Sequence, residues 1–310
     1  MKKLERLVYA LVAAVEMPAV AGLRLENRFP PLFILGAPRS GTTVVYLHVM
    51  NSFEFAYFPN LAKAHPKACV LYSLWGRLAH AYEPTYTSSY GNVDGPMAPT
   101  DGWDIFHRWF PRYDHTRPIR QSGLYELRNI VRLLELVFGA PFANKNNSNS
   151  LRIAHLSALF PNAIFLHVRR DPVDASVSLL EARIRHGVPL GEWWSASPPQ
   201  FLGRRFSDQL EQAVHQVWGI DRYIRDSLDR IPPERRHSIA YEAFCADPGA
   251  LERQIERSYA RMDVTLRRRP GAGSAWLRPR SRPREAELEA RIHRIIERLE
   301  SGSAGGRVHA

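Results

Sequence analysis

The sequence predicts an α/β fold, in which a doubly wound, mostly parallel sheet has helices on both faces. The first observation behind this prediction is the apolar run PLFILG at 31–36, which ends at a glycine. The second is another apolar run, NAIFLHVRR at 162–170, and the third is the helical pattern that follows each run. Continuous apolar runs are typical of strands buried on both faces, and strands that alternate with helices favour a parallel sheet.

The first 22 residues have a basic start, an apolar run at 7–15 and the small residues AVA before Gly22. This pattern is similar to that of a secretory signal. However, Glu5, Arg6 and Glu16 crowd the run, which is too short to cross a bilayer of roughly 20 helical residues. We therefore expect an amphipathic helix that packs on the domain or rests on a membrane surface.

The rest of the chain divides into patterned and unpatterned parts. The segment 51–125 is rich in Tyr, Trp, Pro and Gly and has little periodicity, which is typical of loops that contact a substrate. The further elements predicted in order are helices at 42–50, 123–139, 151–160, 171–185 and 207–229, a strand at 237–241, and an amphipathic helix near the C-terminus. We expect a single domain over 1–310, with its core at 31–260 and a basic tail with the last helix at 261–310.

The composition narrows the class of partner. The formal charge of +11 favours a polyanion, whether nucleic acid, an anionic membrane face or a phosphorylated small molecule, although it also suits a plain arginine-rich surface. The two cysteines, Cys69 and Cys245, have no metal-ligand spacing. A disulfide framework is therefore not expected, and a reducing compartment such as the cytoplasm is.

The stretch GAPRSGTT at 36–43 has the layout of a P-loop, which cradles phosphate with backbone N–H groups and the start of a helix. Thr42 stands where the nucleotide-triphosphate version has the lysine that reaches the β and γ phosphates. Arg39 supplies a cation three residues earlier. The loop is thus suited to one phosphate with a group attached, rather than to a triphosphate with magnesium.

A second anion site is predicted where the other apolar strand ends. The sequence HVRRDPVDASVS places Arg170 at the strand end and Ser178 two turns into the next helix. Parallel strands deliver their carboxyl ends to the same edge of a sheet, where ligands bind. The two loops together would suit a nucleotide with two separate phosphate groups. Arg170 could instead pair with Asp171 or Asp174.

With these motifs in order, about 130 residues apart, the chain resembles the sulfotransferases that use 3′-phosphoadenosine 5′-phosphosulfate (PAPS). The family's first motif appears here as RSGTT at 39–43, and its second as RRDPVDASVS, with Arg170 and Ser178. The YE step at 241–242 and the DP at 247–248 add to the resemblance, which covers roughly 31–260.

The resemblance implies a role for each matching residue. Ser40, Gly41, Thr42 and Thr43 would bind the 5′-phosphate of PAPS, whereas Arg170 and Ser178 would bind its 3′-phosphate, with Tyr241 beside the adenine. Arg39 would lie near the oxygen that bridges phosphate and sulfate, and Lys145 would steady the sulfuryl group. No metal is implied. A cation at the departing oxygen suits sulfuryl transfer, because negative charge develops there.

The acceptor hydroxyl needs a general base. Some family members have a histidine two residues after the lysine, and others a glutamate after the first helix, but this chain has Asn147 and Asn60 at those places. We predict Asp101 as the base, from APTDGWDIFHRW, although an Asp-Gly pair is also common in ordinary turns. The weaker candidates are Asp104, His107 and His65.

A glycan or glycolipid hydroxyl is the first expectation for the acceptor, with a small hydrophobic alcohol second, and Arg108, Arg112 and Arg117 could favour an acidic saccharide. One alternative function is a P-loop kinase or nucleotide hydrolase, which would want Lys at position 42. The other is a non-enzymatic polyanion binder that uses the basic stretches RRRP at 267–270 and RPRSRPR at 278–284. No zinc-finger or RNA-recognition pattern supports nucleic-acid binding. Oligomeric state is left open.

Overall fold

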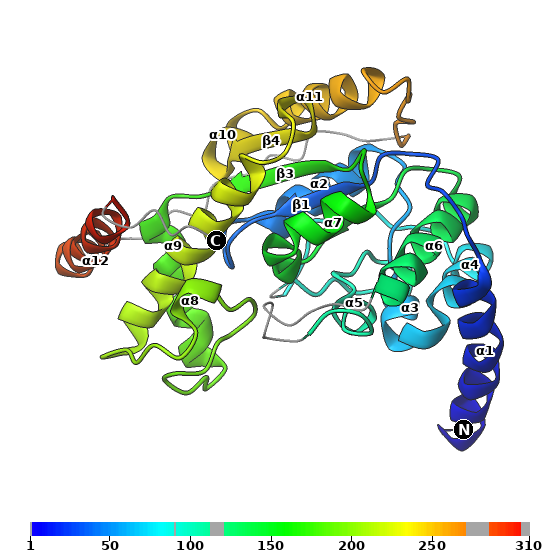
Figure 1. The fold of residues 1–310 in the computed structure, drawn as a ribbon, viewed down its shortest axis with the longest axis horizontal. Coiled ribbons are helices and arrows are strands. Elements are labelled where there is room, and N and C mark those ends of the chain that lie inside the picture. The colour runs from blue at the N-terminus through cyan, green and yellow to red at the C-terminus, as the bar shows by residue number, and fades with distance from the viewer. Residues whose placement is uncertain (1, 90, 112–120, 271–284, 305–310) are drawn as a thin grey trace.

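The computed structural model describes residues 2–89, 91–111, 121–270 and 285–304. At its centre is a sheet with all strands parallel, in the order β2-β1-β3-β4 (Figure 1). The strands are β1 (Leu32–Leu35), β2 (Ala143–Lys145), β3 (Ile164–Arg169) and β4 (Arg236–Ala240). The predicted α/β fold with a mostly parallel sheet is confirmed.

The register of the central strands brings their carboxyl ends level. Ile34 of β1 pairs with Lys145 of β2, and Leu35 pairs with His167 of β3. Every residue of β1 and β2 is buried, as the continuous apolar run of β1 predicts for a strand covered on both faces. The loops that follow β1, β2 and β3 therefore begin side by side at one edge of the sheet.

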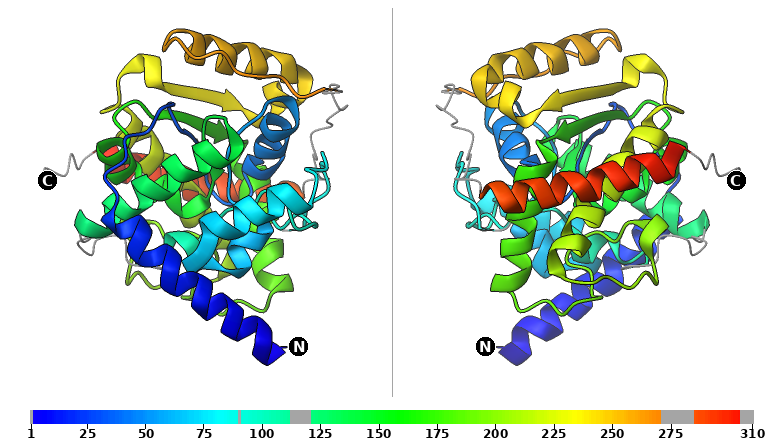
Figure 2. Two further views of the ribbon diagram at one scale, coloured as in Figure 1. Left: turned by 90° about the vertical axis from the view of Figure 1, so that its right-hand side faces the viewer. Right: turned by 90° about the vertical axis from the view of Figure 1, so that its left-hand side faces the viewer.

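Helices cover both faces of this sheet. Figures 1 and 2 show α7 (Ile153–Leu159) and α9 (Gln209–Leu228) on one face and α2 (Thr42–Ser52) on the other. The remaining helices of this half are α8 (Pro172–Arg185) against α9, α10 (Tyr241–Ala246) and α11 (Pro248–Ala260) beyond β4, and α12 (Ala286–Ala304) against α8 and α9. Apolar side chains of α8, α9 and α12 form a core cluster of their own, apart from the main core.

The segment 51–125 contains more regular structure than its sequence predicts. It forms α3 (Asn60–Ala64), the 3₁₀ turn η1 (Pro66–Ala68), α4 (Cys69–Ala79) and the short α5 (Trp103–Phe106). The helix α6 (Gln121–Phe138) follows and packs against α4. The three-turn helix α4 was missed because several of its outward positions are apolar as well, so no amphipathic pattern marks it.

The N-terminal residues form the helix α1 (Lys2–Gly22), which packs against η1, α4 and α6. Its inward face carries Ala13, Glu16 and Val20, all buried. The Glu16 carboxylate accepts hydrogen bonds from the backbone N–H groups of Val70 (3.0 Å) and Leu71 (2.8 Å) at the start of α4. The expected packed helix is present, and among the described residues no helix is long and apolar enough to span a membrane.

The arginines at 267–269 are bound to the body of the protein. Arg267 pairs with Glu54 at 2.6 Å, and Arg268 pairs with carboxylates of α11. The Arg269 Nε donates to the backbone carbonyls of Met50 (2.8 Å) and Phe53 (3.1 Å). These side chains thus hold the segment 267–269 against the C-terminal end of α2 and against α11. The second basic stretch, RPRSRPR, lies outside the described residues.

Candidate functional site

The glycine loop between β1 and α2 folds tightly back over the end of the sheet. A Cβ atom at Gly36 would lie 2.4 Å from the Ser40 Oγ and 2.9 Å from the backbone oxygen of Val168 on β3, so only glycine fits there. The Gly36 N–H donates to the Ser150 Oγ (3.0 Å), which ties the loop to the segment after β2. The loop is therefore held from both neighbouring strands.

Two residues of this loop adopt left-handed backbone conformations. Gly41, at φ 90°, precedes the first turn of α2, and a Cβ atom there would lie 2.3 Å from the ring of Tyr241. Arg39 is at φ 70°, which is uncommon for a residue with a side chain and occurs most often at functional sites. The loop is thus shaped by local strain at Arg39 and by the packing of Tyr241 on Gly41.

The second predicted anion site, at Arg170 and Ser178, is in direct contact with the glycine loop. The Arg39 Nε donates to the Ser178 Oγ on α8 at 3.0 Å, and the Arg170 Nη1 donates to the backbone oxygen of Arg39 at 3.1 Å. The Arg170 guanidinium also lies over the Tyr241 ring, 5.1 Å from its centroid. Residues from β1–α2, β3–α8 and the start of α10 therefore form one connected cluster, which the sequence separates by about 200 residues.

The loop has the donors that a phosphate group requires. The hydroxyl of Ser40 is buried and has no hydrogen-bond partner among the described residues. Thr42 and Thr43 form the first turn of α2, where backbone N–H groups have no partner within the helix and the helix dipole favours an anion. A buried, unsatisfied hydroxyl beside a helix N-terminus fits a phosphate oxygen as its missing partner.

Lys145 lies at the end of β2, close to this loop. A Cβ atom added to Gly91 would lie 3.4 Å from the Lys145 Nζ and 3.6 Å from the Thr43 Oγ1. The amine of Lys145 and the hydroxyl of Thr43 are therefore near one another. Burial lowers the pKa of Lys145; the charge of Asp101 opposes this shift, and the charge of Arg39 adds to it. A negatively charged ligand in the loop between β1 and α2 would stabilise the charged form of this buried lysine.

The structure brings Asp101 to the same place. The Asn144 and Asn146 Nδ2 atoms, on either side of Lys145, donate to the Asp101 backbone oxygen at 3.2 and 3.1 Å. The Asp101 Oδ1 accepts the hydrogen bond of the Trp103 N–H (3.1 Å), as in an ordinary Asx turn. Asp101 is thus a turn residue, as its Asp-Gly setting suggests, and its loop is fixed beside Lys145, whereas its role as a base stays a prediction.

The weaker base candidates lie elsewhere. The His65 ring stacks on Tyr72, with centroids 3.7 Å apart, and contacts Tyr9 of α1, so it belongs to the α1–α4 contact. His107 ends α5 and packs edge-on against Trp103 at 4.0 Å, and Asp104 lies in the first turn of α5. Of the four candidates, Asp101 is the one with an electrostatic interaction with Lys145.

Comparison with known proteins identifies the family. A family model described as the sulfotransferase family matches residues 30–266, which is most of the chain. The chain belongs to the sulfotransferase family. The resemblance based on RSGTT and on the Arg170–Ser178 motif is thereby confirmed.

Solved sulfotransferases share the fold of this family member. Sulfotransferase STF9 from Mycobacterium avium matches it with a TM-score of 0.53 and 19% identity, over 93% of this chain and 72% of that chain. Sulfotransferase STF1 from Mycobacterium tuberculosis matches with a TM-score of 0.53 and 16% identity, over 82% of this chain and 73% of that chain. No curated protein matches the chain.

The contacts that Ser150, Asn147 and Ser195 make beside the loop cluster were not predicted from sequence. Ser150 both accepts from the Gly36 N–H and donates to the Gly36 oxygen (3.2 Å), and Asn147 donates to the Ser195 Oγ at 3.0 Å. Ser195 has φ 73°, another left-handed non-glycine residue. The polar run NKNNSNS at 144–150 was the available signal, since few apolar residues interrupt it after a buried strand.

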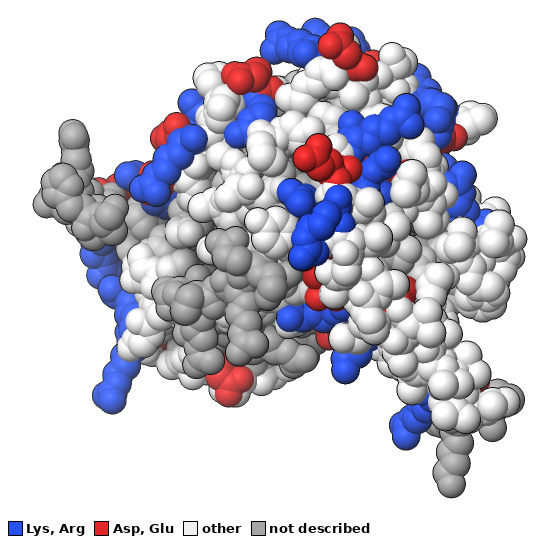
Figure 3. Space-filling view, turned by 45° about the vertical axis from the view of Figure 1, so that its right-hand side comes forward, with Lys and Arg blue, Asp and Glu red and all other residues white. Residues whose placement is uncertain are grey.

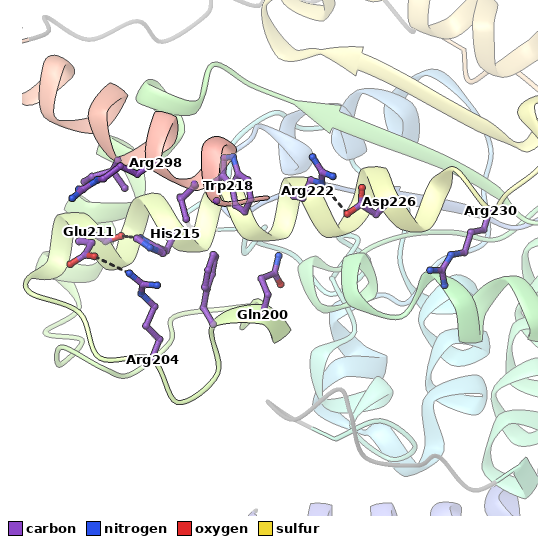
Figure 4. A pocket seen from close by; sticks show the side chains of 13 residues that line it. Gln200, Arg204, Glu211, His215, Trp218, Arg222, Asp226, Arg230 and Arg298 are labelled. Carbon is purple, nitrogen blue, oxygen red and sulfur yellow. Dashed lines mark hydrogen bonds and ion pairs between the residues drawn. The ribbon is translucent and has the colours of Figure 1, made fainter. Parts of the chain in front are cut away.

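A separate groove of about 700 Å³ runs along α9, between α12 and the segment around Phe201 (Figure 4). Arg204 points toward Glu211 at 3.5 Å, and Arg222 pairs with Asp226 at 3.0 Å. None of the predicted site residues is among the described residues that line it. The groove is thus separate from the loop cluster formed by the predicted site residues.

Proposed function

We propose that this sulfotransferase uses PAPS as its donor and transfers the sulfuryl group to a hydroxyl on a glycan or glycolipid. The observation that supports the proposal most is the connected cluster of Arg39, Gly41, Arg170, Ser178 and Tyr241. It combines two anion-binding loops with an aromatic ring in one place. A nucleotide with an adenine and two separate phosphates matches this set of groups.

The residues present fit that donor. The Ser40 hydroxyl and the start of α2, with Thr42 and Thr43, would bind the 5′-phosphate. Arg170 and Ser178 would bind the 3′-phosphate, which distinguishes PAPS from nucleotides that lack it. When bound, PAPS supplies an activated sulfuryl group, and the chain supplies position, charge and a base.

In the proposed reaction, Asp101 accepts the proton of the acceptor hydroxyl through Oδ2, because Oδ1 holds the Trp103 N–H. The acceptor oxygen forms a bond to sulfur while the bond from sulfur to the bridging phosphate oxygen breaks. Arg39 and Lys145 stabilise the electron pair left on that oxygen. Loss of one preorganised donor of this kind typically costs about 2.7–4 kcal/mol in the barrier.

The inserted segment 51–125 would bind the acceptor. It contributes both Asp101 and the aromatic Trp103 beside it, and an indole face is a suitable platform for a sugar ring. Arg108, which could favour an acidic saccharide, pairs with Glu126 in the structure and lies over the Trp109 ring at 4.7 Å. Arg112 and Arg117 lie outside the described residues.

We also propose that the protein works in the cytoplasm and contacts a membrane surface through α1. Cys69 and Cys245 are both buried and free, which is consistent with a reducing compartment. The outward side of α1 carries exposed apolar residues, among them Leu4 and Leu11. A lipid-linked acceptor would then be met at the membrane.

The two alternative functions receive less support. A triphosphate kinase needs a lysine where Thr42 begins α2, and the chain belongs to the sulfotransferase family instead. A polyanion binder would use RRRP, but Arg267 and Arg268 already pair with carboxylates of the protein and Arg269 donates to backbone carbonyls.

Calorimetric titration with 3′-phosphoadenosine 5′-phosphate tests the donor site. We expect binding that is much tighter than that of adenosine 5′-phosphate, and Arg170→Ala should remove the difference. Arg169→Ala is the matched control, because Arg169 is the adjacent arginine at the exposed end of β3. Equal affinity for the two nucleotides would contradict the two-phosphate site. Transfer of radiolabelled sulfate from PAPS to lipid and glycan extracts, with mass identification of the product, tests the acceptor.

A further inference from the structure

The outward face of α1 carries apolar residues that are largely exposed in the described structure. Leu4, Leu7, Leu11 and Val15 are 67, 57, 61 and 67% exposed, and they recur at three- and four-residue spacing. The inward face, with Ala13, Glu16 and Val20, is already packed on the domain. A helix on the surface of a globular protein usually turns a polar face outward, so this one has a second apolar face to cover.

The helix α4 continues the same surface. Leu71, Leu74, Trp75 and Leu78 are 39, 40, 53 and 80% exposed. Glu16 of α1 bonds the backbone at the start of α4, and the rings of Tyr9 and Tyr72 meet at 6.4 Å, so the two helices are neighbours. We call the eight exposed residues the α1–α4 face. They are Leu4, Leu7, Leu11, Val15, Leu71, Leu74, Trp75 and Leu78.

The shape of this region suits a flat apolar partner. Figures 1 and 2 show α1 projecting beyond the body of the protein with the N-terminus at its far end. In Figure 3 the surface over this projection is mostly white, with some blue near its end, whereas most of the blue of lysine and arginine lies elsewhere on the view. A contiguous exposed apolar surface of this kind marks an interaction site. Because the helix projects, it can insert into a flat partner, which need not offer a concave surface to receive it.

The charges around the α1–α4 face favour an anionic partner. Arg6, Lys67 and Arg77 are exposed on α1, η1 and α4, whereas Glu5 is the one exposed acid on these elements within the described structure. Glu16 is buried and bonded. Two copies of the chain joined through this face would bring like charges together, in a protein of net charge +11. Anionic lipid head groups would instead neutralise them, at about 1 kcal/mol per basic residue.

The face is also continuous with the segment that carries Asp101. From α4, the chain returns through the turn at 91–95, where the Asn60 Nδ2 holds the carbonyls of Val93 (2.6 Å) and Gly95 (2.8 Å). Gly91, in the same turn, lies against Lys145 and Thr43. The α4 half of the α1–α4 face and the candidate acceptor site thus belong to one inserted segment, and α1 packs against that segment.

We propose that the α1–α4 face is an interfacial docking surface that lies on an anionic bilayer, with its leucines and Trp75 in the head-group region. Helices with an apolar face and flanking basic residues bind membranes in this way. This inference extends the membrane contact proposed above from α1 to a two-helix surface with a lipid preference. It does not depend on the transfer reaction, since binding is measured without turnover.

Vesicle flotation tests the proposal with the full chain and two preparations, phosphatidylcholine alone and phosphatidylcholine with phosphatidylglycerol. We expect the native protein to float with the anionic vesicles and to bind neutral ones at least roughly tenfold more weakly. The double variant Leu7→Asp/Leu11→Asp should lose roughly tenfold or more of the anionic binding. Its melting temperature should stay unchanged, because both side chains point to solvent.

Ile184→Asp is the matched control, since Ile184 is 65% exposed but lies on α8. It should float like the native protein. Arg6→Glu/Lys67→Glu should reduce binding to anionic vesicles and leave neutral binding unchanged. The proposal is overturned if neither preparation binds, if both bind equally, or if sedimentation shows a dimer that the Leu7/Leu11 variant dissociates. Calorimetry with 3′-phosphoadenosine 5′-phosphate on the same variants shows separately whether the donor site is intact.

Discussion

Arg39 is expected to take part in catalysis, and its backbone is strained. The substitutions Arg39→Gly and Arg39→Ala separate these two properties. The Arg39 φ of 70° lies in the left-handed region, which costs a residue with a Cβ atom about 1–2 kcal/mol. Glycine avoids this cost but adds about 0.5–1 kcal/mol of chain entropy relative to alanine. Arg39→Gly should therefore be more stable than Arg39→Ala by up to about 1.5 kcal/mol. Both variants lose the same hydrogen bond to Ser178.

Turnover should not distinguish the two variants. Both variants lack the guanidinium, so kcat should fall by about 10²–10³ in each, as for loss of one preorganised electrostatic donor. For a chain of this length, a stability difference of about 1 kcal/mol corresponds to roughly 1–2 °C in Tm. Scanning calorimetry measures the stability, and a PAPS-dependent sulfate transfer assay measures kcat. Arg39→Lys, which keeps the charge, should retain part of the turnover.

The two readouts can fail independently. Turnover of Arg39→Gly within roughly tenfold of the native protein would remove Arg39 from the proposed chemistry. A glycine variant that is less stable than the alanine variant by about 0.5–1 kcal/mol would show instead that the backbone at this position carries no strain. Either result would leave the fold and the family assignment in place.

The remaining predictions concern the base, the loop and the lysine. Asp101→Asn keeps the bond to the Trp103 N–H, so kcat should fall by about 10²–10⁴ while calorimetry shows an unchanged Kd for 3′-phosphoadenosine 5′-phosphate. Gly41→Ala places a Cβ atom 2.3 Å from the Tyr241 ring at a φ of 90°, so it should lower stability by more than about 1 kcal/mol and weaken nucleotide binding; unchanged Tm and Kd would contradict this packing. Because burial lowers the pKa of Lys145 below its ordinary 10.5, kcat/KM should fall on the alkaline side at a lower pH than for an exposed lysine, and Lys145→Arg should move that limb to higher pH. The unfolded chain binds this proton more tightly, so stability should rise as pH increases through the window between the two pKa values, and Lys145→Met should abolish that rise in a pH series of Tm.

The sheet and its ligand-binding edge could be predicted because their signals are local. The run LFIL and the loop GAPRSGTT predict a buried strand and a phosphate-binding turn within a few residues of each other, and β1 and α2 form there. The Asp-Pro start of the helix after β3 predicts α8, whose Asp171 side chain accepts from the Asp174 N–H. Caps and buried runs depend on neighbours in sequence, so they can be predicted without knowledge of the tertiary structure.

Contacts between distant segments were harder to predict from the sequence. Nothing near Asp101 in sequence predicts that Asn144 and Asn146 hold its backbone oxygen, more than forty residues away. The hydrogen bond between Arg39 and Ser178 was not predicted either, because the two residues were expected at different ends of the nucleotide. The helix α4 was missed for another reason, since Trp75 and Leu78 face outward and remove the polar face that marks a surface helix.

The topology explains how these distant residues come to share one site. β1 and β3 are adjacent parallel strands, and Leu35 pairs with His167, so the loops beginning at Gly36 and Arg170 leave the sheet side by side. Any insertion between them, including 51–125, can vary without separating the two loops, because their spacing is set by backbone hydrogen bonds between strands. A sulfotransferase with 19% identity shares this fold. It also follows that acceptor choice should be sought in the insertion and donor choice in the loops.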